Sequence, residues 1–374
     1  MSDARFMRHA LRLARRGYGA TSPNPMVGAV LVKRGQIIGR GWHRRAGAAH
    51  AEIDALRDAQ KRGHSPRGAT LFVTLEPCCT HGRTPPCTDA LIAAGLRRVV
   101  VGAADPNPKH AGRGLAILRR AGISVFPGAL AEECAHLNDA FNHWIVQRTP
   151  FVTVKAAMTL DGKIATAGGE SKWITGETAR AHGMKLRQGS DAILVGINTV
   201  LNDDPSLTVR VKSKSGKPQP RQPRRIVLDS LARTPLNAKI VSDALVALTT
   251  IVVSPRAPKS RVSALAKKAR VLVAPLAKPA SKLNLRWLLK KLGAENVTSL
   301  LVEGGGEVNA SFLLGGFAHR VAFFYAPKIL GGRDSRKGVA GEGVRSLREV
   351  VQLCDLEWRR LGADWLLTAR VAGT

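Results

Sequence analysis

The chain has 374 residues, of which 44% are hydrophobic, so it is longer than a typical single domain and has enough apolar material for two cores. Lys and Arg (58) exceed Asp and Glu (27), and the formal net charge is +31. The sequence has no apolar run of about 18 residues, no apolar signal core near its start and five cysteines, an odd number. These features argue against membrane-spanning and disulfide-framed proteins. We expect a cytoplasmic protein with no membrane partner.

The excess of positive charge is spread along the chain, with +12 over residues 1–149 and +19 over residues 150–374. A nucleic-acid-binding domain typically gathers its basic residues in one patch, and single-strand binders add aromatic stacking platforms. Aromatic residues make up only 5% of this chain. We therefore expect no specific nucleic-acid partner. A generally cationic surface would instead attract phosphorylated small molecules.

Helices and strands are expected to alternate over residues 1–146. Apolar residues recur at helical spacing in residues 3–16, where Phe6, Ala10, Leu13 and Ala14 would face a core. The further expected elements are a hairpin of 27–33 and 36–42, strands at 69–75 and 98–101, and helices at 50–62, 87–94, 112–121 and 130–146. This order predicts a three-layer α/β/α sandwich.

The most informative feature of this half is His50-Ala51-Glu52, followed by Cys78 and Cys87. One imidazole and two thiolates suit a tetrahedral Zn²⁺ whose fourth position is left to water. Glu52 lies two residues beyond the histidine, within reach of that water, and a non-ligand Glu of this kind transfers protons in zinc-dependent nucleobase deaminases. A structural zinc knuckle would usually show a fourth Cys or His at short spacing. The motif therefore predicts a catalytic zinc site.

Local structure around the motif is also predictable. His50 would open one helix, and Cys78 and Cys87 would lie at or near the starts of others, where the helix dipole lowers thiol pKa values. Cys79 is the alternative to Cys78 as a ligand. Cys134, in an expected helix, is most simply a small core residue.

A Gln-Arg-Thr-Pro break near residue 148 precedes a second series of strands, so we expect domains at residues 1–147 and 150–374. Residues 211–225 hold six basic residues, three prolines and no acid, and are expected to form a mobile surface loop. The expected strands lie at 151–158, 163–166, 190–195, 225–228, 249–253, 271–274, 298–302 and 321–326, with a strand pair within 350–371. The expected helices lie at 177–188, 259–269, 284–292 and 307–314.

A glycine-rich turn, Glu-Gly-Gly-Gly-Glu at residues 303–307, joins an expected buried strand to a helix. Unhindered backbone N–H groups at a helix start can hold a phosphate. The run is not G-x-G-x-x-G, which argues against an ordinary Rossmann domain. Taken alone, the turn is equally consistent with a tight connection, and both interpretations stay open.

Residues 1–146 resemble the cytidine/deoxycytidylate deaminase superfamily, and more closely the deaminase half of the bifunctional riboflavin-biosynthesis deaminase/reductases. The superfamily usually separates its two cysteines by two residues, whereas here eight residues separate them, in a loop ending His-Gly-Arg-Thr-Pro-Pro-Cys. Pro-Asn-Pro-Met-Val-Gly at residues 23–28 also matches the family. The resemblance implies Glu52 as the catalytic residue, His50, Cys78 and Cys87 as zinc ligands, Asn24 as a substrate contact, and His43, His81 and Arg83 as either pocket or solvated loop residues.

The second half resembles the reductase half of the same family in segments 169–175, 196–210 and 303–307. That half has a dihydrofolate-reductase-like α/β fold and uses NADPH. The resemblance implies NADPH contacts from Trp173, Thr199, Asp203, Ser230 and Gly305. It implies substrate contacts from Ser171, Arg187, Leu207, Arg210 and Glu303, with the two arginines suited to a phosphate. Lys155 and Asp161 also match, in roles either of binding or of structure.

The two resemblances imply consecutive steps of riboflavin synthesis on a phosphorylated pyrimidine, by a homo-oligomeric enzyme. The first is deamination of 2,5-diamino-6-ribosylamino-4(3H)-pyrimidinone 5′-phosphate, and the second is NADPH-dependent reduction of its ribosyl group to ribityl. An RNA-editing deaminase would use the same zinc site but would leave the second half unexplained. A nucleic-acid-binding protein with a degenerate enzyme fold is disfavoured because all the ligands and Glu52 are present.

Overall fold

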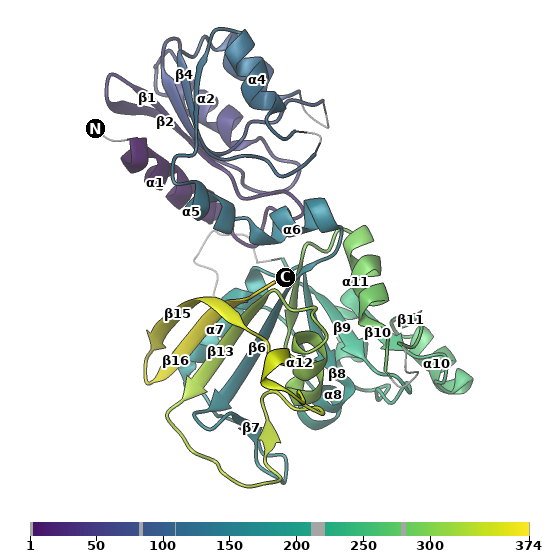
Figure 1. Ribbon diagram of the computed structural model, residues 1–374. Helices are drawn as coiled ribbons and strands as arrows, with labels where there is room; N and C mark the ends of the chain where they lie inside the picture. The colour runs from purple at the N-terminus through teal and green to yellow at the C-terminus, as the bar shows by residue number, and fades with distance from the viewer. Residues whose placement is uncertain (1–2, 82–84, 109, 211–220, 278–281, 374) are drawn as a thin grey trace. The chain divides into compact units, whose positions relative to one another are not determined.

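The computed structural model describes residues 3–81, 85–108, 110–210, 221–277 and 282–373 (Figure 1). By its internal contacts the chain divides into two compact units, Met1–Arg148 and Thr149–Thr374. In the described part of the chain, no helix is both long enough and apolar enough to cross a membrane. Each unit has its own sheet and its own hydrophobic clusters.

The first unit contains a five-stranded sheet in the order β2-β1-β3-β4-β5, in which β1 is antiparallel to both neighbours and β3, β4 and β5 are parallel. Its strands are β1 (Gly28–Lys33), β2 (Gln36–Trp42), β3 (Thr70–Leu75), β4 (Arg98–Ala103) and β5 (Ser124–Pro127). Its helices are α1 (Asp3–Ala14), α2 (Ala51–Lys61), α3 (Cys87–Ala93), α4 (Arg113–Arg120), α5 (Ala131–His136) and α6 (Asp139–Gln147).

Alternation along β3 shows how this sheet is covered on both faces. Leu71 and Val73 pack in one cluster with α2, α3 and α4, whereas Phe72, between them, packs in another with α1 and α5. Successive side chains of a strand point to opposite faces, so both faces of the sheet are buried under helices. The predicted three-layer α/β/α architecture is confirmed.

The second unit is built on a nine-stranded sheet in the order β11-β10-β9-β8-β12-β6-β13-β16-β15, parallel from β11 to β13, with β16 antiparallel to both neighbours. Its strands are β6 (Phe151–Thr159), β8 (Ala192–Gly196), β9 (Arg224–Leu228), β10 (Thr249–Val253), β11 (Arg270–Val273), β12 (Ser299–Val302), β13 (Arg320–Ala326), β15 (Leu353–Leu361) and β16 (Asp364–Val371). A small separate sheet pairs β7 (Lys163–Ala165) with β14 (Arg336–Lys337).

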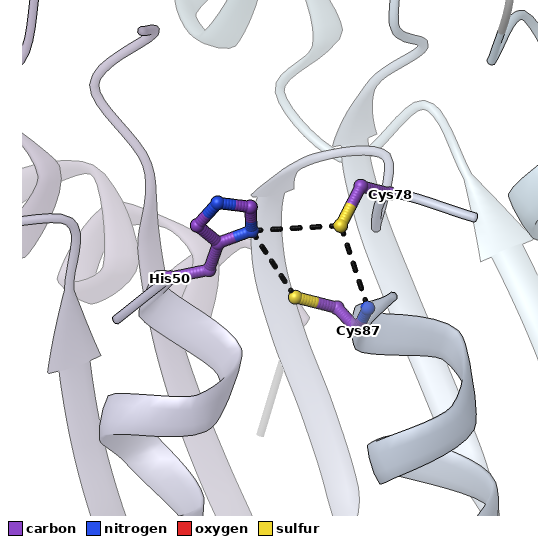
Figure 2. A group of neighbouring side chains, drawn as sticks. All are labelled: His50, Cys78 and Cys87. Atoms are coloured by element: carbon purple, nitrogen blue, oxygen red, sulfur yellow. Dashed lines mark hydrogen bonds between the residues drawn. The ribbon is translucent and has the colours of Figure 1, made fainter. Parts of the chain in front are cut away.

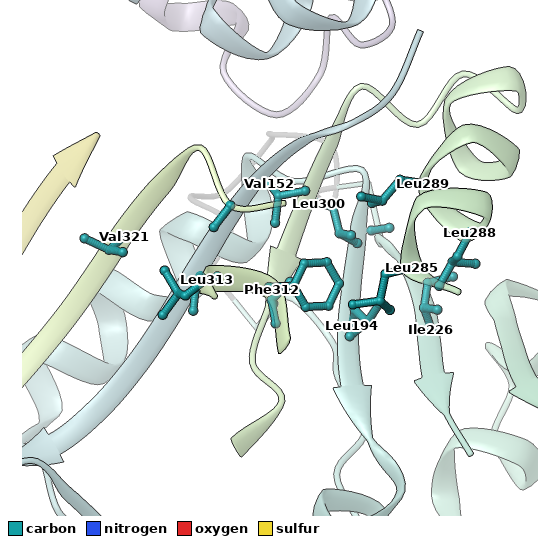
Figure 3. Close-up of a cluster of buried hydrophobic side chains, with 14 of the residues drawn as sticks. Val152, Leu194, Ile226, Leu285, Leu288, Leu289, Leu300, Phe312, Leu313 and Val321 are labelled. Atoms are coloured by element: carbon teal, nitrogen blue, oxygen red, sulfur yellow. The ribbon is translucent and has the colours of Figure 1, made fainter. Parts of the chain in front are cut away.

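Helices also cover both faces of the larger sheet. Leu288 of α11 and Phe312 of α12 pack with Val152, Leu194 and Leu300 on one face (Figure 3). On the other face, α8, α9 and α10 pack against side chains of β8, β9, β10 and β12, including Ile193, Val195 and Leu301, which alternate with Leu194 and Leu300. The helices of this unit are α7 (Glu177–Gln188), α8 (Ile197–Asp203), α9 (Lys239–Ser242), α10 (Lys259–Ala266), α11 (Leu285–Ala294) and α12 (Gly305–Leu313).

Several elements differ from the sequence-based expectation. The helix expected over 130–146 is two helices, because Asn138 between them turns its amide to Met26, accepting from its N–H at 2.7 Å and donating to its carbonyl at 2.9 Å. Short elements without strong periodicity, β5, α8, α9 and β14, were not predicted.

The prediction of a surface loop over residues 211–225 was wrong for the last two residues of that range. Residues 211–220 lie outside the described residues, but Arg224 and Arg225 belong to β9, and Arg225 is only 1% exposed. The strand expected over 225–228 is confirmed and begins one residue earlier, and it takes Arg225 into the interior of the sheet, where the composition of 211–225 had suggested exposed charge.

Candidate active sites

Three side chains able to bind a metal converge in the first unit. The Nδ1 atom of His50 lies 3.5 Å from Cys78 Sγ and 3.3 Å from Cys87 Sγ. Figure 2 shows both sulfur atoms facing the imidazole, and all three ligand atoms lie within 4.8 Å of one another. Atoms this close can share one ion at ordinary zinc–nitrogen and zinc–sulfur distances.

The local backbone explains this convergence. His50 is the extended N-cap residue of α2, and Cys87 is the first residue of α3. Cys78 follows β3 in a loop, so the expected helix start was wrong there, and its sulfur instead accepts the backbone N–H of Cys87 at 3.4 Å. Gly41 of β2 brings α2 close, because a Cβ there would lie 2.2 Å from the carbonyl oxygen of Ala51.

The electrostatics of this donor set fit a dication. A hydrogen bond from the Cys87 thiol and the proximity of His50 lower the pKa of Cys78 to about 4. The pKa of Cys87 is raised, first by its hydrogen bond to Cys78 and then by burial. Loss of its proton would place a second thiolate beside Cys78 and Glu52, a repulsion that Zn²⁺ would relieve.

Glu52 lies in the first turn of α2 and is 3% exposed. Burial, and next the negative charge of Cys78, raise its pKa to about 7. Its carboxyl is in hydrogen-bonding contact with Cys87. A carboxyl group with a pKa near neutral can both take up and release a proton, which is the property a proton shuttle needs.

Asn24 and His43 form a polar pair beside the converging ligands. His43 is 3% exposed, and burial lowers its pKa. A neutral ring that donates from Nδ1 to the Ala49 carbonyl, 3.1 Å away, leaves Nε2 to accept from Asn24 Nδ2 at 3.2 Å. The His43 and His50 rings are edge-on, with centroids 5.5 Å apart.

The other cysteines of this unit lie apart from the ligands. Cys79 Sγ lies 3.7 Å from His110 Nδ1 and is not among the three converging side chains. Cys134 is fully buried in the cluster beneath α1 and α5. His81 is exposed, and Arg83 lies outside the described residues.

Sequence reasoning missed Glu76. This buried carboxylate accepts three backbone N–H groups, from Asp105 at 3.3 Å and from Gly112 and Gly114 at 3.0 Å. It thereby ties the loop that carries Cys78 to the segment leading into α4. An acidic residue at the end of a strand, two positions before a ligand, was the available signal.

In the second unit, several predicted residues lie at one edge of the sheet. Thr199 lies in α8, directly after β8, Ser230 follows β9, and Glu303 and Gly305 follow β12. These three strands are adjacent and parallel, so their carboxyl ends meet at the same edge, where α/β sheets bind ligands. Gly305 has a φ of +74° and begins α12, with open space where a Cβ would point.

Arg187 and Glu303 form a bidentate ion pair in this unit. The Nη2–Oε2 distance is 2.6 Å and the Nε–Oε1 distance is 3.1 Å. Burial opposes ionisation of Glu303, but Lys155 and Arg187 lower its pKa to about 2. Arg187 is therefore committed to a carboxylate, a partner that sequence reasoning did not foresee when it assigned this arginine to a phosphate.

A second group lies where residues 171–173 meet the end of α8. Ser171 Oγ donates to Asp203 Oδ1 at 3.5 Å, and Lys172 Nζ lies 3.9 Å from the same oxygen. Trp173 is 65% exposed, and the Arg180 guanidinium lies over its ring, 4.6 Å from the centroid. The exposed part of this residue is accessible to a ligand.

Three further predicted residues of this unit differ in exposure and in hydrogen bonding: Leu207, Arg210 and Asp161. Leu207 is 3% exposed as a whole residue, and its side chain packs in the cluster with α8 and α9. Arg210 is exposed. Asp161 accepts from Thr159 Oγ1 at 2.6 Å and from the N–H groups of Leu330 and Gly331, which fits a structural role in joining two turns.

Comparison with known families assigns both halves. Residues 1–103 match the cytidine and deoxycytidylate deaminase zinc-binding region, and residues 150–367 match the RibD C-terminal domain. Riboflavin biosynthesis protein RibD of Actinobacillus pleuropneumoniae is 44% identical, over 98% of this chain and 95% of the relative. The protein of the same name from Escherichia coli is 41% identical, over 97% and 98%.

Solved structures agree over the full length. Acinetobacter baumannii RibD superposes with a TM-score of 0.85 at 36% identity, covering 99% of each chain. A Thermotoga maritima diaminohydroxyphosphoribosylaminopyrimidine deaminase/5-amino-6-(5-phosphoribosylamino)uracil reductase gives 0.81 at 35%, covering 99% of this chain and 98% of that one. This chain belongs to the RibD family and is a bifunctional enzyme of riboflavin biosynthesis, with a zinc-dependent deaminase half followed by an NADPH-dependent reductase half.

Proposed function

We propose that the first half deaminates 2,5-diamino-6-ribosylamino-4(3H)-pyrimidinone 5′-phosphate and that the second half reduces the ribosyl group of the product to ribityl. The observation that best supports the proposed deamination is the convergence of His50, Cys78 and Cys87 beside the buried Glu52. The name of the Thermotoga maritima relative, which is a deaminase and reductase of such compounds, supports the choice of substrate.

In the deaminase half, His50, Cys78 and Cys87 would hold Zn²⁺, which when bound supplies a Lewis acid that lowers the pKa of water. Glu52 would take one proton from the water and pass it to the ring nitrogen, and would then move the remaining hydroxyl proton to the departing amino group. Oxygen from water replaces nitrogen at C2, and ammonia leaves. Asn24, held by His43, would hydrogen-bond the pyrimidine.

In the reductase half we propose two sets of contacts. NADPH, which when bound supplies a hydride, would lie against Trp173, Thr199, Asp203, Ser230 and Gly305. The substrate would lie against Ser171, Arg187, Leu207, Arg210 and Glu303. C1′ of the opened sugar gains the hydride and the adjoining nitrogen gains a proton. Because Arg187 is paired with Glu303, the exposed Arg210 is the better candidate for the substrate phosphate.

The domains are proposed to span residues 1–147 and 150–374, which the division into compact units supports. We also propose a homo-oligomer, supported by the exposed Leu356, Trp358 and Trp365 on the two strands at one end of the larger sheet. A cytoplasmic location is supported by the free thiols of all five cysteines, which suit a reducing compartment.

The test is to incubate the zinc-loaded protein with the phosphorylated diaminopyrimidine and NADPH while following ammonia release and NADPH oxidation separately. We expect ammonia without NADPH, and one NADPH oxidised per ammonia when both substrates are present. NADPH oxidation that precedes ammonia release would contradict the proposed order of steps.

A further inference from the structure

The buried guanidinium of Arg225 uses every N–H group that it has. Its Nε donates to Thr249 Oγ1 at 2.9 Å, and its Nη2 donates to the Ile240 carbonyl at 3.0 Å and to Asp243 Oδ1 at 2.8 Å. Its Nη1 donates to Asp243 Oδ2 at 2.6 Å and to the Ser206 carbonyl at 3.1 Å. An arginine has five N–H donors, so none is left over.

The bond to Ser206 reaches a segment that lacks regular structure. Residues 204–210 belong to no helix or strand, and two of them, Asp204 and Leu207, have positive φ angles of 40° and 50°. Such a backbone is unfavourable for a residue such as Leu207 and persists only where the surroundings impose it. The segment therefore depends on contacts from outside itself.

Those contacts come from side chains on both sides of Leu207. Arg225 donates to the carbonyl of Ser206, the residue before Leu207. Arg187 Nη1 donates to the carbonyl of Thr208, the residue after it, at 3.2 Å. The Gln222 amide then pairs with both backbone groups of Val209, at 2.9 and 3.1 Å.

The short helix α9 completes the support. The Lys239 N–H at its start donates to Asp204 Oδ1 at 2.8 Å, and Asp243, directly after it, pairs with Arg225. Arg225 lowers the pKa of Asp243, which keeps that carboxylate charged. Residues 204–210 are thus bonded to α9 directly at Asp204, and at Ser206 through Arg225 and Asp243.

We propose that Arg225 is a positioning residue of the reductase, which holds residues 206–208 and so places the exposed Arg210 for contact with the substrate. The inference rests on the proposed function, because the contact of Arg210 with the substrate is part of it. Arg225 itself is 1% exposed and does not touch the substrate.

The main variant is Arg225→Lys, which keeps the charge and the pair with Asp243 but cannot supply the same set of bonds. Losing a charge-assisted bond to the Ser206 carbonyl should raise the substrate KM of the reductase about tenfold, with a smaller change in the NADPH KM. Hydrogen–deuterium exchange of peptides spanning 204–210 should speed up, and deaminase turnover should stay unchanged.

The matched control is Arg270→Lys. Arg270, in the edge strand β11, also forms a bidentate ion pair in the same unit, and its partner is Glu295 rather than a residue of 204–210. If Arg225→Lys only lowers the melting temperature and leaves exchange over 204–210 and the substrate KM at the Arg270→Lys values, the proposal is overturned.

If Arg225→Lys does not fold, Asp243→Asn is the second variant. It weakens the ion pair that holds the Arg225 guanidinium and leaves the arginine itself in place. Faster exchange over 204–210 together with a raised substrate KM supports the proposal, and unchanged exchange overturns it. Failure of the proposed function would look different: the unmodified enzyme would show no NADPH oxidation, while the exchange measurement would still report on Arg225.

Discussion

Glu303 and Arg187, 116 positions apart in the chain, form a bidentate ion pair with side chains only 10% and 12% exposed. The pair links the end of β12 to the last turn of α7. Arg187 also donates to the Thr208 carbonyl, so one side chain connects three separate parts of the proposed reductase site.

Removing one partner of this pair should destabilise the second unit strongly. Arg187→Met removes the bidentate partner of a buried carboxylate and leaves it only the charge of Lys155, and we expect a loss of up to about 3–5 kcal/mol in unfolding free energy. The double variant Arg187→Met/Glu303→Gln should recover much of that loss, because no charge is then left alone. Urea-induced unfolding measures both, and a double variant less stable than the single one would contradict the account.

Acid should weaken the same pair in a defined pH window. The folded-state pKa of Glu303 is about 2, below its ordinary value of 4.5, so its contribution to stability is complete above about pH 5. That contribution is lost as the pH falls from there toward 2. The stability gap between the unmodified enzyme and Glu303→Gln should therefore narrow below pH 5. Proteolysis of the second unit across this range, with fragments identified by mass spectrometry, tests the prediction.

The metal site predicts unequal effects of replacing Cys87 and Cys79. Cys87→Ser should lose most of the zinc, because it removes one of three converging ligands. Cys79→Ser should keep about one zinc per chain, since its sulfur lies toward His110. Metal analysis of the purified proteins decides this, and equal losses would contradict the ligand assignment.

The net charge predicts weak binding to RNA that falls steeply with added salt. Replacing Lys212, Lys214 and Lys217 with Gln should reduce that binding and leave reductase kinetics unchanged. Arg210→Ala should do the reverse, raising the reductase KM. Arg225 is not replaced in this variant, because it is buried and forms an ion pair with Asp243. Filter binding at several salt concentrations gives the comparison, and a specific RNA complex that survives physiological salt would contradict it.

Sequence patterns predicted the parts of this molecule that are specified locally. The His-Ala-Glu motif, the Cys78 and Cys87 ligands and most strands follow from spacing and alternation within short stretches. The pairing of Arg187 with Glu303 and the burial of Arg225 depend on which strands become neighbours in the nine-stranded sheet. The composition of residues 211–225 favoured an exposed loop, although a strand was also expected from Arg225. The parallel pairing of β9 with β8 and β10 is what places this arginine inside.

The most direct test of the central claim, two independent reactions on one chain, is the variant Glu52→Gln. It should bind zinc normally and lose nearly all release of ammonia from the phosphorylated diaminopyrimidine, because only the proton-transferring carboxylate is gone. Given 5-amino-6-(5-phosphoribosylamino)uracil instead, the same preparation should oxidise NADPH at the rate of the unmodified enzyme. Loss of NADPH oxidation on that deaminated compound, with zinc and fold intact, would contradict the division into a deaminase and a separate reductase.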